Sequence, residues 1–355
     1  MDSFSRLKKT FSLEKADRPP ILGGWLAAPG HIRSLAGCSE DEYWEDPHYW
    51  EVAAERLLGS DGLVDIFVPV SRDEFRCVNT HVLEERAQYT VESLLEEIDH
   101  LPEVDQIKAE FDEEAEYRLY REEFLARQKL CGDMLWCPAD WSILPTALWY
   151  GKYGYETALM TLAWYPEQYR KLITSSAEKG HLRARLIARA IQEGIHPGAI
   201  LTGEDLCSQQ GSIASPAFLR REYWHLVEYA FSPLVDAGAK LIWHCDGNYR
   251  QILGDVMATG VAGLQGFQKE CGMDLEWIAD LHTKNGDPLI IFGPMEVTTT
   301  MHNASPSEIH SYVNKVIDFY RDRISLVFFT SNTLTPDIPL ENIQAYWSAV
   351  RESHW

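Results

Sequence analysis

The chain of 355 residues lacks the short motifs that mark several large enzyme classes. It contains no GxxxxGK[ST] segment, no GxGxxG segment with strand–turn–helix spacing, no GxSxG elbow and no HExxH pair. The sequence therefore gives no support to a P-loop or dinucleotide-binding enzyme, a simple serine hydrolase or a zincin.

Basic residues are scarce. The 32 Lys and Arg stand against 54 Asp and Glu, which leaves a net charge of −22. Proteins that bind nucleic acid need clustered cations to neutralise phosphates. The composition therefore argues against nucleic acid as the partner of this protein. No run approaches the ~20 apolar residues that span a bilayer, so we expect no membrane segment.

Cysteines do not form a recognisable framework. The seven of them are an odd number, they are scattered along the chain, and no two make a CxxC pair. The first twenty residues hold a basic cluster but no apolar segment, so they do not predict a secretory signal. Reduced thiols and a cytoplasmic location are expected.

Short apolar runs alternate with amphipathic helical patterns along most of the chain. Several runs are almost continuously apolar, as in strands buried on both faces. Eight strands are predicted, at 20–25, 63–70, 132–137, 199–203, 240–243, 263–267, 289–292 and 326–330. Helices are predicted at 167–194, after Pro166, and at 307–320, with Ser305 or Ser307 as cap. Eight strand–helix units favour a closed (β/α)8 TIM barrel, with an open doubly wound sheet as the alternative.

The segment 81–130 interrupts this rhythm. It holds fifteen acidic and six basic residues and predicts a helical insertion with a turn at Leu101–Pro102. A solvated face is the simpler interpretation of its charge, and a docking surface for a partner protein is the alternative. Since no linker or internal repeat divides the chain, we expect one barrel domain over 1–355, preceded by a short N-terminal extension.

In a barrel of this kind the active site lies at the carboxyl ends of the strands. His244 and Asp246 follow the fifth strand and, by alternation, point to the same side, where they can share a metal or form an acid–base pair. Glu204 and Asp205 follow the fourth strand, and only one of two adjacent residues can face the cavity; Glu204 is taken as the third predicted metal ligand. Asp65, inside an apolar run, and Asn332 complete the candidate catalytic set.

Aromatic and polar residues at other strand ends suggest a binding pocket. The predicted substrate-binding residues are Trp25, Tyr150, Trp243, Gln268 and Glu296. Most of the twelve tryptophans are expected in the core, while a subset lining a flat slot would suit a planar ligand such as an aromatic ring or a tetrapyrrole.

Taken together, these segments resemble the uroporphyrinogen decarboxylase superfamily. The resemblance rests on RPPILGGW, VDIFVPV, GEDLCSQQGSIASPAFLRREYW, KLIWHCDGN, FGPMEV and TSNTLTPDIPLENIQAYWSAVRE. The P-D-x-P-x-E-N core at 336–342 is its most specific part. The resemblance implies a (β/α)8 barrel, and dimers are common in this superfamily.

Departures from the family pattern indicate which branch of the superfamily the chain resembles. The decarboxylases carry an arginine-rich segment after the first strand, where this chain has only Arg33, and a histidine where it has Asn332. Asp65 does match their central aspartate. The thiol-methylating branch binds zinc through a His-x-Cys pair and a later Cys, and here Asp246 and Asn332 stand at the two Cys positions.

The His-x-Asp-Gly variant resembles enzymes that take a methyl group from a methoxylated aromatic and pass it to a cobalamin-bearing corrinoid protein. The resemblance thus implies a corrinoid-dependent methyltransferase, an O-demethylase, in which an acid or a metal such as zinc polarises the ether oxygen. The alternatives are a carboxy-lyase of the uroporphyrinogen decarboxylase type and a non-catalytic protein that binds a tetrapyrrole or a small aromatic.

Overall fold

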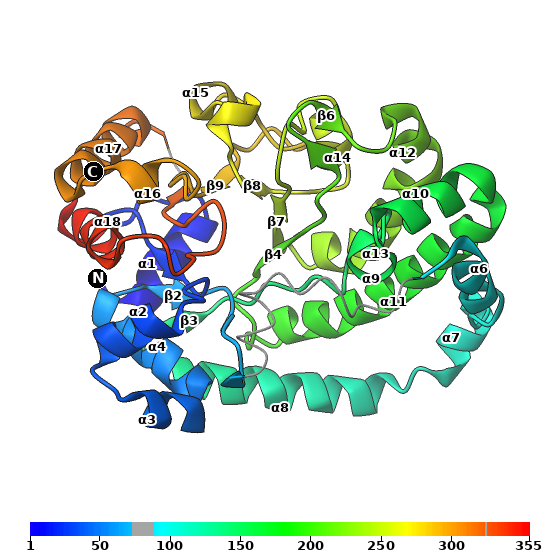
Figure 1. Cartoon of the computed structure of the whole chain (residues 1–355), viewed down its shortest axis with the longest axis horizontal. Helices are drawn as coiled ribbons and strands as arrows, with labels where there is room; N and C mark the ends of the chain where they lie inside the picture. The colour runs from blue at the N-terminus through cyan, green and yellow to red at the C-terminus, as the bar shows by residue number, and fades with distance from the viewer. Residues whose placement is uncertain (73–88, 324) are drawn as a thin grey trace.

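The computed structural model describes residues 1–72, 89–323 and 325–355 (Figure 1). Eight parallel strands form its centre: β1 (Leu22–Gly23), β2 (Gly62–Leu63), β3 (Leu135–Trp136), β4 (Ala199–Gly203), β7 (Lys240–His244), β8 (Gly263–Gln265), β9 (Ile290–Phe292) and β10 (Leu326–Val327). The remaining strands, β5 (Cys207–Ser208) and β6 (Gly211–Ser212), make a small antiparallel hairpin.

The parallel strands follow one another around a ring. One sheet has the order β1-β2-β3 and the other the order β10-β9-β8-β7-β4. Isolated parallel bridges join the two sheets at both edges, between Ala139 and Leu201 and between Ile21 and Phe328. Each of the eight predicted strands is present, and the arrangement confirms the predicted (β/α)8 fold class.

The second strand is shorter than predicted. The apolar run at 63–70 predicts a long strand, but pairing ends at Leu63. Ile66 and Val68 remain buried because they pack among the helices instead. The apolar run therefore predicts that these residues are buried, but it does not predict where strand pairing ends.

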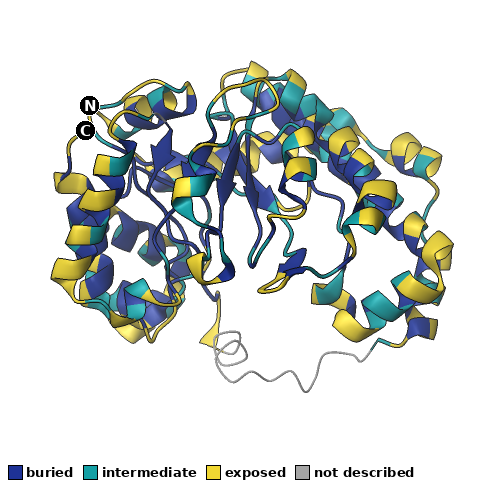
Figure 2. Cartoon of the chain, turned by 90° about the horizontal axis from the view of Figure 1, so that it is seen from above, coloured by how far each residue is buried: buried dark blue, intermediate teal, exposed yellow. Residues whose placement is uncertain are grey.

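Helices surround the strands, with their buried residues toward the strands and their exposed residues on the outside (Figures 1 and 2). Before β3 they are α1 (Ser3–Phe11), α2 (Pro29–Ala36), α3 (Glu40–Glu45), α4 (Pro47–Leu58), α6 (Val91–Asp99), α7 (Val104–Glu110) and α8 (Glu113–Cys131). Between β3 and β7 lie α9 (Tyr150–Tyr153), α10 (Tyr155–Trp164), α11 (Pro166–Gln192), α12 (Pro216–Glu222) and α13 (Trp224–Asp236). The rest are α14 (Leu253–Ala258), the 3-10 helix η2 (Lys269–Cys271), α15 (Leu275–Ile278), α16 (Thr300–Asn303), α17 (Pro306–Tyr320) and α18 (Leu340–Glu352).

Two of these helices start as their sequences predict. Pro166 opens α11, and Ser305 caps α17 in a capping box with Glu308. The described part of the 81–130 segment is the helical run α6, α7 and α8, interrupted between Asp99 and Val104. The single-domain organisation stays a prediction. Among the described residues, none of the helices has the length and apolar content needed to cross a bilayer.

Apolar side chains separate into an inner and an outer layer because strand residues alternate. The inner cluster fills the barrel with side chains such as Val64, Leu201, Ile242 and Phe292, and α1 adds Leu7 and Phe11 at the amino end of the strands. Strand residues of the other parity, such as Leu63 and Leu241, pack on the helices. This division decides which side chains after each strand face the barrel axis.

Candidate active site at the carboxyl end of the barrel

His244, the last residue of β7, has the inward parity of Ile242. Its ring is buried, and Trp25 and Trp141 each meet it edge-on with ring centroids 5.8 Å away. The Nδ1 atom makes a short hydrogen bond with Gln265 Oε1, on the next strand in the same register. Nε2 points toward two carboxylates, with Asp205 Oδ1 at 3.5 Å and Asp246 Oδ1 at 4.0 Å.

Asp246 lies beside His244 as the alternation predicts. Its Oδ2 accepts a hydrogen bond of 2.8 Å from Asn332 Nδ2, while Oδ1 is buried and has no hydrogen-bond partner among the described residues. Burial raises the pKa of Asp246 and the neighbouring Asp205 charge raises it further, whereas His244 and Asn332 act in the opposite direction. One carboxylate oxygen is thus anchored and the other is free for a ligand.

Asp205 is the third member of the group. Its Oδ1 accepts the Asp246 backbone N–H at 2.8 Å, and its Oδ2 accepts the Tyr150 hydroxyl at 3.1 Å. The turn from β4 needs Gly203, because a Cβ atom there would lie 2.0 Å from the His244 carbonyl oxygen. This close approach lets the loop after β4 reach across the end of β7.

Together Asp205, His244 and Asp246 have the composition of a metal site. Each offers one ligand atom, and these three atoms lie within 4.8 Å of one another. Imidazole nitrogen and carboxylate oxygen are ligands for zinc and for other first-row metals. The buried, unpartnered Asp246 Oδ1 supports a cation here, because a desolvated acceptor without a donor is unfavourable.

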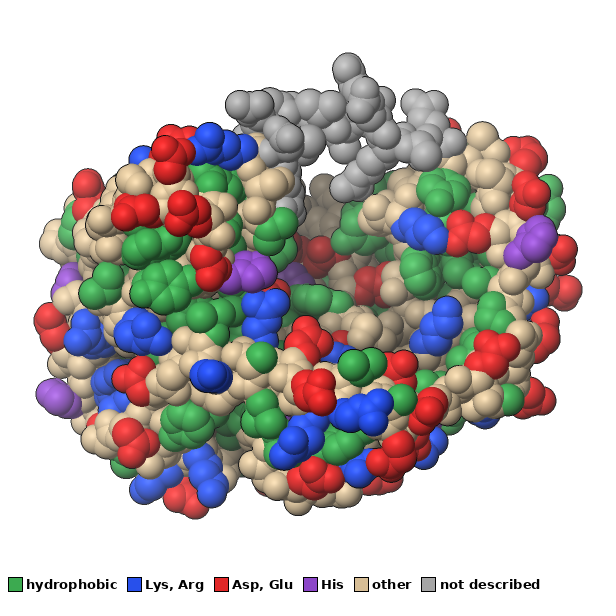
Figure 3. All heavy atoms as spheres, turned by 90° about the horizontal axis from the view of Figure 1, so that it is seen from below, with side chains coloured by type: hydrophobic (Ala, Val, Ile, Leu, Met, Phe, Trp, Pro, Cys, Tyr) green, Lys and Arg blue, Asp and Glu red, His purple; other side chains and the backbone are tan. Residues whose placement is uncertain are grey.

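A cavity of about 370 Å³ opens beside His244. Its wall includes the aromatic side chains of Trp141, Trp149 and Tyr150, and its lining also includes Glu204 and Asp205. The Tyr150 ring stacks on Tyr155 with centroids 4.4 Å apart. In the space-filling view, one face of the molecule is hollowed and acidic side chains lie inside the hollow (Figure 3).

Glu204 lines this cavity, but its carboxylate is engaged elsewhere. It accepts hydrogen bonds from the backbone N–H groups of Ala147 and Leu148 and from the Tyr223 hydroxyl at 3.0 Å. Burial raises the pKa of Glu204 to about 7. Asp205, which has the inward parity of Leu201, is therefore the residue that lies with His244 and Asp246, at the place predicted for Glu204.

The structure does not bring Asp65 to His244, because Asp65 has the outward parity of Leu63. It lines a separate pocket between α8 and α11, together with Arg127 and His196. Burial raises the pKa of Asp65, and its Oδ1 accepts a hydrogen bond of 2.7 Å from the neighbouring Ile66 N–H. The expectation of one pocket shared with Asp65 is corrected accordingly.

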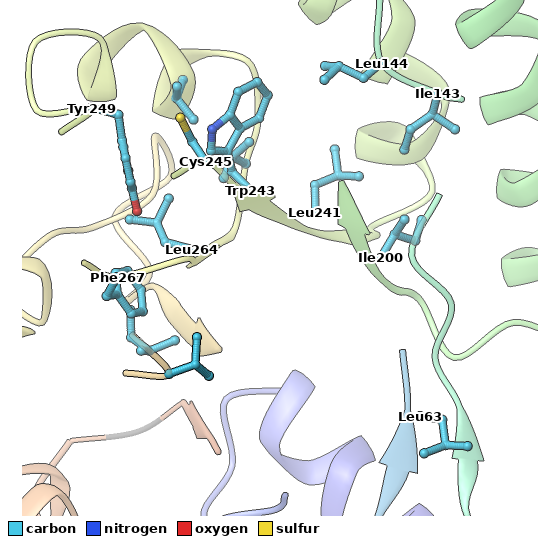
Figure 4. Packing of buried hydrophobic residues seen from close by; sticks show 14 of the residues in the cluster. Leu63, Ile143, Leu144, Ile200, Leu241, Trp243, Cys245, Tyr249, Leu264 and Phe267 are labelled. Atoms are coloured by element: carbon cyan, nitrogen blue, oxygen red, sulfur yellow. The ribbon is translucent and has the colours of Figure 1, made fainter. Parts of the chain in front are cut away.

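Trp243 is also outside the cavity. It lies in the outer layer with Leu241 and Cys245, and packs on Trp224 with ring centroids 5.9 Å apart (Figure 4). The alternation that turns His244 inward turns Trp243 outward. Trp25, which follows the end of β1, belongs to the inner cluster, and its ring meets His244 edge-on.

Two other predicted binding residues have supporting positions. Gln268 Oε1 accepts the Gly247 N–H at 2.6 Å and so holds the loop that follows Asp246. Glu296 accepts hydrogen bonds from Thr299 and Thr300 and lines a different pocket, bounded by α15 and α17. Neither side chain lines the cavity beside His244.

Comparison with known proteins identifies the family. The family model of uroporphyrinogen decarboxylase (URO-D) matches residues 143–353, which is more than half of the chain. The chain belongs to the uroporphyrinogen decarboxylase family. A solved methyltransferase from Methanosarcina mazei has the same fold, with a TM-score of 0.60 and 13% identity over 99% of both chains. No curated protein matches the chain.

The matched region of this uroporphyrinogen decarboxylase family member contains Asp205, His244, Gln265, Asp246 and Asn332. The sequence prediction prefers Glu204 to its neighbour Asp205 and omits Gln265, and Trp141, which lies before the matched region, is only one of several aromatic residues near predicted strand ends. Strand alternation was the available signal for Asp205 and Gln265: Asp205 continues the inward series of Ala199 and Leu201, and Gln265 shares the register of His244. Trp141 follows the third predicted strand, but this position does not distinguish it from the other aromatic residues near strand ends.

Proposed function

We propose that this protein is a corrinoid-dependent methyltransferase, an O-demethylase that moves the methyl group of a small methoxylated aromatic to a corrinoid protein. The observation that carries the proposal is the aromatic-walled cavity beside His244, with a histidine and carboxylates converging on one point. A planar ring fits against Trp141, Trp149 and Tyr150, and a substituent oxygen can then reach the polar group. Methyl transfer is also the activity named for the M. mazei protein of the same fold.

The charge of the cavity favours this substrate over a porphyrinogen. Its lining residues include Glu204 and Asp205, and no Lys or Arg is among those that the structure describes. A substrate bearing eight carboxylates would meet like charge there, which is destabilising in a partly desolvated site. A neutral aryl ether has no such cost.

The residues present fit a divalent metal. His244 Nε2, Asp205 and Asp246 Oδ1 would hold it, and zinc is the ion that we propose. When bound, it supplies Lewis acidity toward an oxygen atom. If metal is absent, a proton shared between His244 and the two carboxylates serves the same end as a general acid.

The reaction balances without an external oxidant or reductant. The methyl carbon would pass from the ether oxygen to the reduced cobalt of the partner protein, which would supply the electron pair of the new bond. The electron pair of the broken C–O bond would stay on the aryl oxygen, which then takes up a proton. Negative charge develops on that oxygen in the transition state, so a positive group beside it lowers the barrier. Tyr150 orients Asp205, and Asn332 orients Asp246, so both carboxylates are held ready.

The test combines purified protein, a reduced corrinoid protein and a panel of methoxybenzenes, with the cobalt absorption spectrum as readout. Formation of methyl-cobalt with at least one substrate, slowed about 10²-fold or more in His244→Ala, is expected. Elemental analysis should show about one zinc per chain, lost in the same variant. Absence of methyl-cobalt with every substrate would refute the proposal.

Two other outcomes point to the alternative functions. Carbon dioxide release from uroporphyrinogen that survives Asn332→Ala and disappears in Asp65→Ala would indicate a carboxy-lyase. Tight binding of an aromatic or tetrapyrrole that is unchanged in His244→Ala and Asp246→Ala, with no turnover, would indicate a binding protein.

We place the activity in the cytoplasm. The cysteines are odd in number and scattered along the chain, which suits a reducing compartment.

A further inference from the structure

Gln265, the last residue of β8, has a side chain whose every polar atom is engaged. The residue is fully buried. Its Nε2 donates to the Thr330 carbonyl oxygen at 2.7 Å and to the Ser331 carbonyl oxygen at 3.1 Å, beyond the end of β10. Its Oε1 contacts Nδ1 of His244. The amide thus connects the histidine of β7 to a strand that is not a neighbour of β8.

The two carbonyl groups fix which way the amide points. A backbone carbonyl oxygen only accepts hydrogen bonds, so the NH2 group must face Thr330 and Ser331. The rotated amide would set three acceptor oxygens against one another in a buried site, which is costly. Oε1 therefore faces His244, and it can only accept a hydrogen bond from Nδ1–H.

We propose that Gln265 is a positioning residue that holds His244 in the Nδ1–H tautomer, so that the Nε2 lone pair points at the space between Asp205 and Asp246. An imidazole nitrogen binds a metal through its lone pair, and its second nitrogen needs an acceptor to fix ring and tautomer. Gln265 supplies that acceptor. The inference deepens the proposed function, since it rests on the metal group proposed above.

Asp246 and Asp205, the other two proposed metal ligands, are also each held by a neighbouring side chain. Asn332 occupies the outer oxygen of Asp246, and Tyr150 occupies Oδ2 of Asp205. Each of these side chains thus holds one atom of a proposed metal-binding residue. The atoms left directed at the common centre are His244 Nε2, Asp246 Oδ1 and Asp205 Oδ1. Gln265 is the member of this outer set that decides a tautomer.

Three variants separate positioning from packing. Gln265→Leu removes the acceptor for Nδ1 and the donor for the two carbonyls. Gln265→Glu keeps an acceptor but loses the donor. Asn342→Leu is the matched control: Asn342 is a buried amide that donates to the carbonyls of Met301 and Ala304, at 2.9 and 2.8 Å, and it contacts no residue of the site in the described structure.

The first measurement is the long-range ¹H–¹⁵N spectrum of histidine-labelled, metal-free protein at pH 8, with His244→Asn used to assign the ring. The wild type and Gln265→Glu are expected to show the Nδ1–H pattern. Gln265→Leu is expected to lose it, while Asn342→Leu keeps it. An Nε2–H pattern in the wild type, or an unchanged pattern in Gln265→Leu, would overturn the inference.

The second measurement is the zinc dissociation constant, by competition with a chromophoric chelator. Gln265→Leu should weaken zinc binding 10- to 100-fold, and Gln265→Glu and Asn342→Leu by less than threefold. A zinc affinity within twofold of the wild type in Gln265→Leu would also refute it. The nitrogen spectrum does not depend on catalysis, so a protein that fails to transfer methyl groups still decides the role of Gln265.

Discussion

Asn332 donates its side-chain N–H to Asp246 Oδ2 at 2.8 Å, although 86 positions separate the two residues in sequence. The contact joins the exits of β10 and β7 across the mouth of the barrel. It leaves Asp246 with one anchored oxygen and one buried oxygen that has no hydrogen-bond partner in the described part of the chain. The orientation of Asp246 thus depends on Asn332.

Asn332→Ala should therefore weaken the site without unfolding the protein. We expect zinc affinity and the rate of methyl-cobalt formation each to fall about 10-fold or more, because the freed carboxylate can rotate away from His244. Asn303→Ala is the control, since Asn303 is an exposed amide bonded to the Thr299 carbonyl. Wild-type affinity and rate in Asn332→Ala would show that the contact has no part in the site.

Strand alternation explains which residues of the site the sequence could predict. His244 and Asp246 follow from it directly, and the rule also excludes Trp243 and favours Asp205 over Glu204 when it is applied to the whole barrel. Sequence reasoning erred by taking nearness to a strand end as sufficient. Asp65 shows this most clearly, because its strand is at the right place in the ring while its side chain faces the helices.

Other features need the three-dimensional path of the chain. The turn at Ala147 and Leu148 directs two N–H groups at Glu204, and no local pattern announces that turn. The bonds from Gln265 to Thr330 and Ser331 exist because the ring closes and brings the exits of β8 and β10 together. The periodicity of apolar residues predicts the helices and strands. Contacts between the ends of non-neighbouring strands exist because the ring of strands closes.

Trp141 and Trp243 make opposite predictions. Trp141 is 41% exposed in the cavity wall, and its ring meets His244 edge-on. Trp141→Ala should raise the KM for the aromatic substrate about tenfold, with little change in the free energy of unfolding, because it removes one wall of the slot. Steady-state kinetics and urea unfolding measure the two quantities.

Trp243→Phe should do the reverse, since it leaves a gap in the outer core and lowers the free energy of unfolding by about 1–3 kcal/mol, with KM unchanged. Trp164→Ala is the surface control, because Trp164 is 62% exposed at the end of α10. A tenfold rise of KM in Trp243→Phe with KM unchanged in Trp141→Ala would contradict the placement of the cavity.

Asp61 is expected to be a stabilising residue at the amino end of the barrel. Its buried carboxylate pairs with Arg6 at 2.5 Å and with Arg18 at 2.8 Å, and it accepts the Ile21 N–H. Asp61→Asn leaves the poorly solvated Arg18 guanidinium without its counter-charge and leaves Arg6 with the more exposed Asp17 alone, so the free energy of unfolding should fall by about 3–5 kcal/mol.

Asp17→Asn is the matched comparison for that experiment. Asp17 also pairs with Arg6, but its side chain is 39% exposed, and the loss should be below about 1 kcal/mol. Urea unfolding curves give both values. Equal losses in the two variants would show that burial of Asp61 adds nothing to the strength of its ion pairs.

His196 should make the stability of the fold depend on pH. It is buried beside Phe124, and its Nδ1 accepts the Gly198 N–H at 3.0 Å. Burial, with a smaller effect of the Arg183 charge, lowers the pKa of His196 to about 3 from an ordinary value of 6.5. Between these values the unfolded chain binds a proton that the folded protein does not, so the free energy of unfolding falls as pH decreases from 6.5 toward 3.

The experiment compares urea unfolding of the wild type and His196→Gln at pH 7 and pH 5. The glutamine variant starts lower at pH 7 because it disturbs a packed core, but it lacks the titrating group. The wild type should therefore lose about 2 kcal/mol more than the variant between the two pH values. His181→Gln, at a half-buried histidine that stacks on Tyr229, should keep the pH dependence of the wild type. If His196→Gln and the wild type lose stability in parallel, His196 is solvated enough to take up its proton in the folded state.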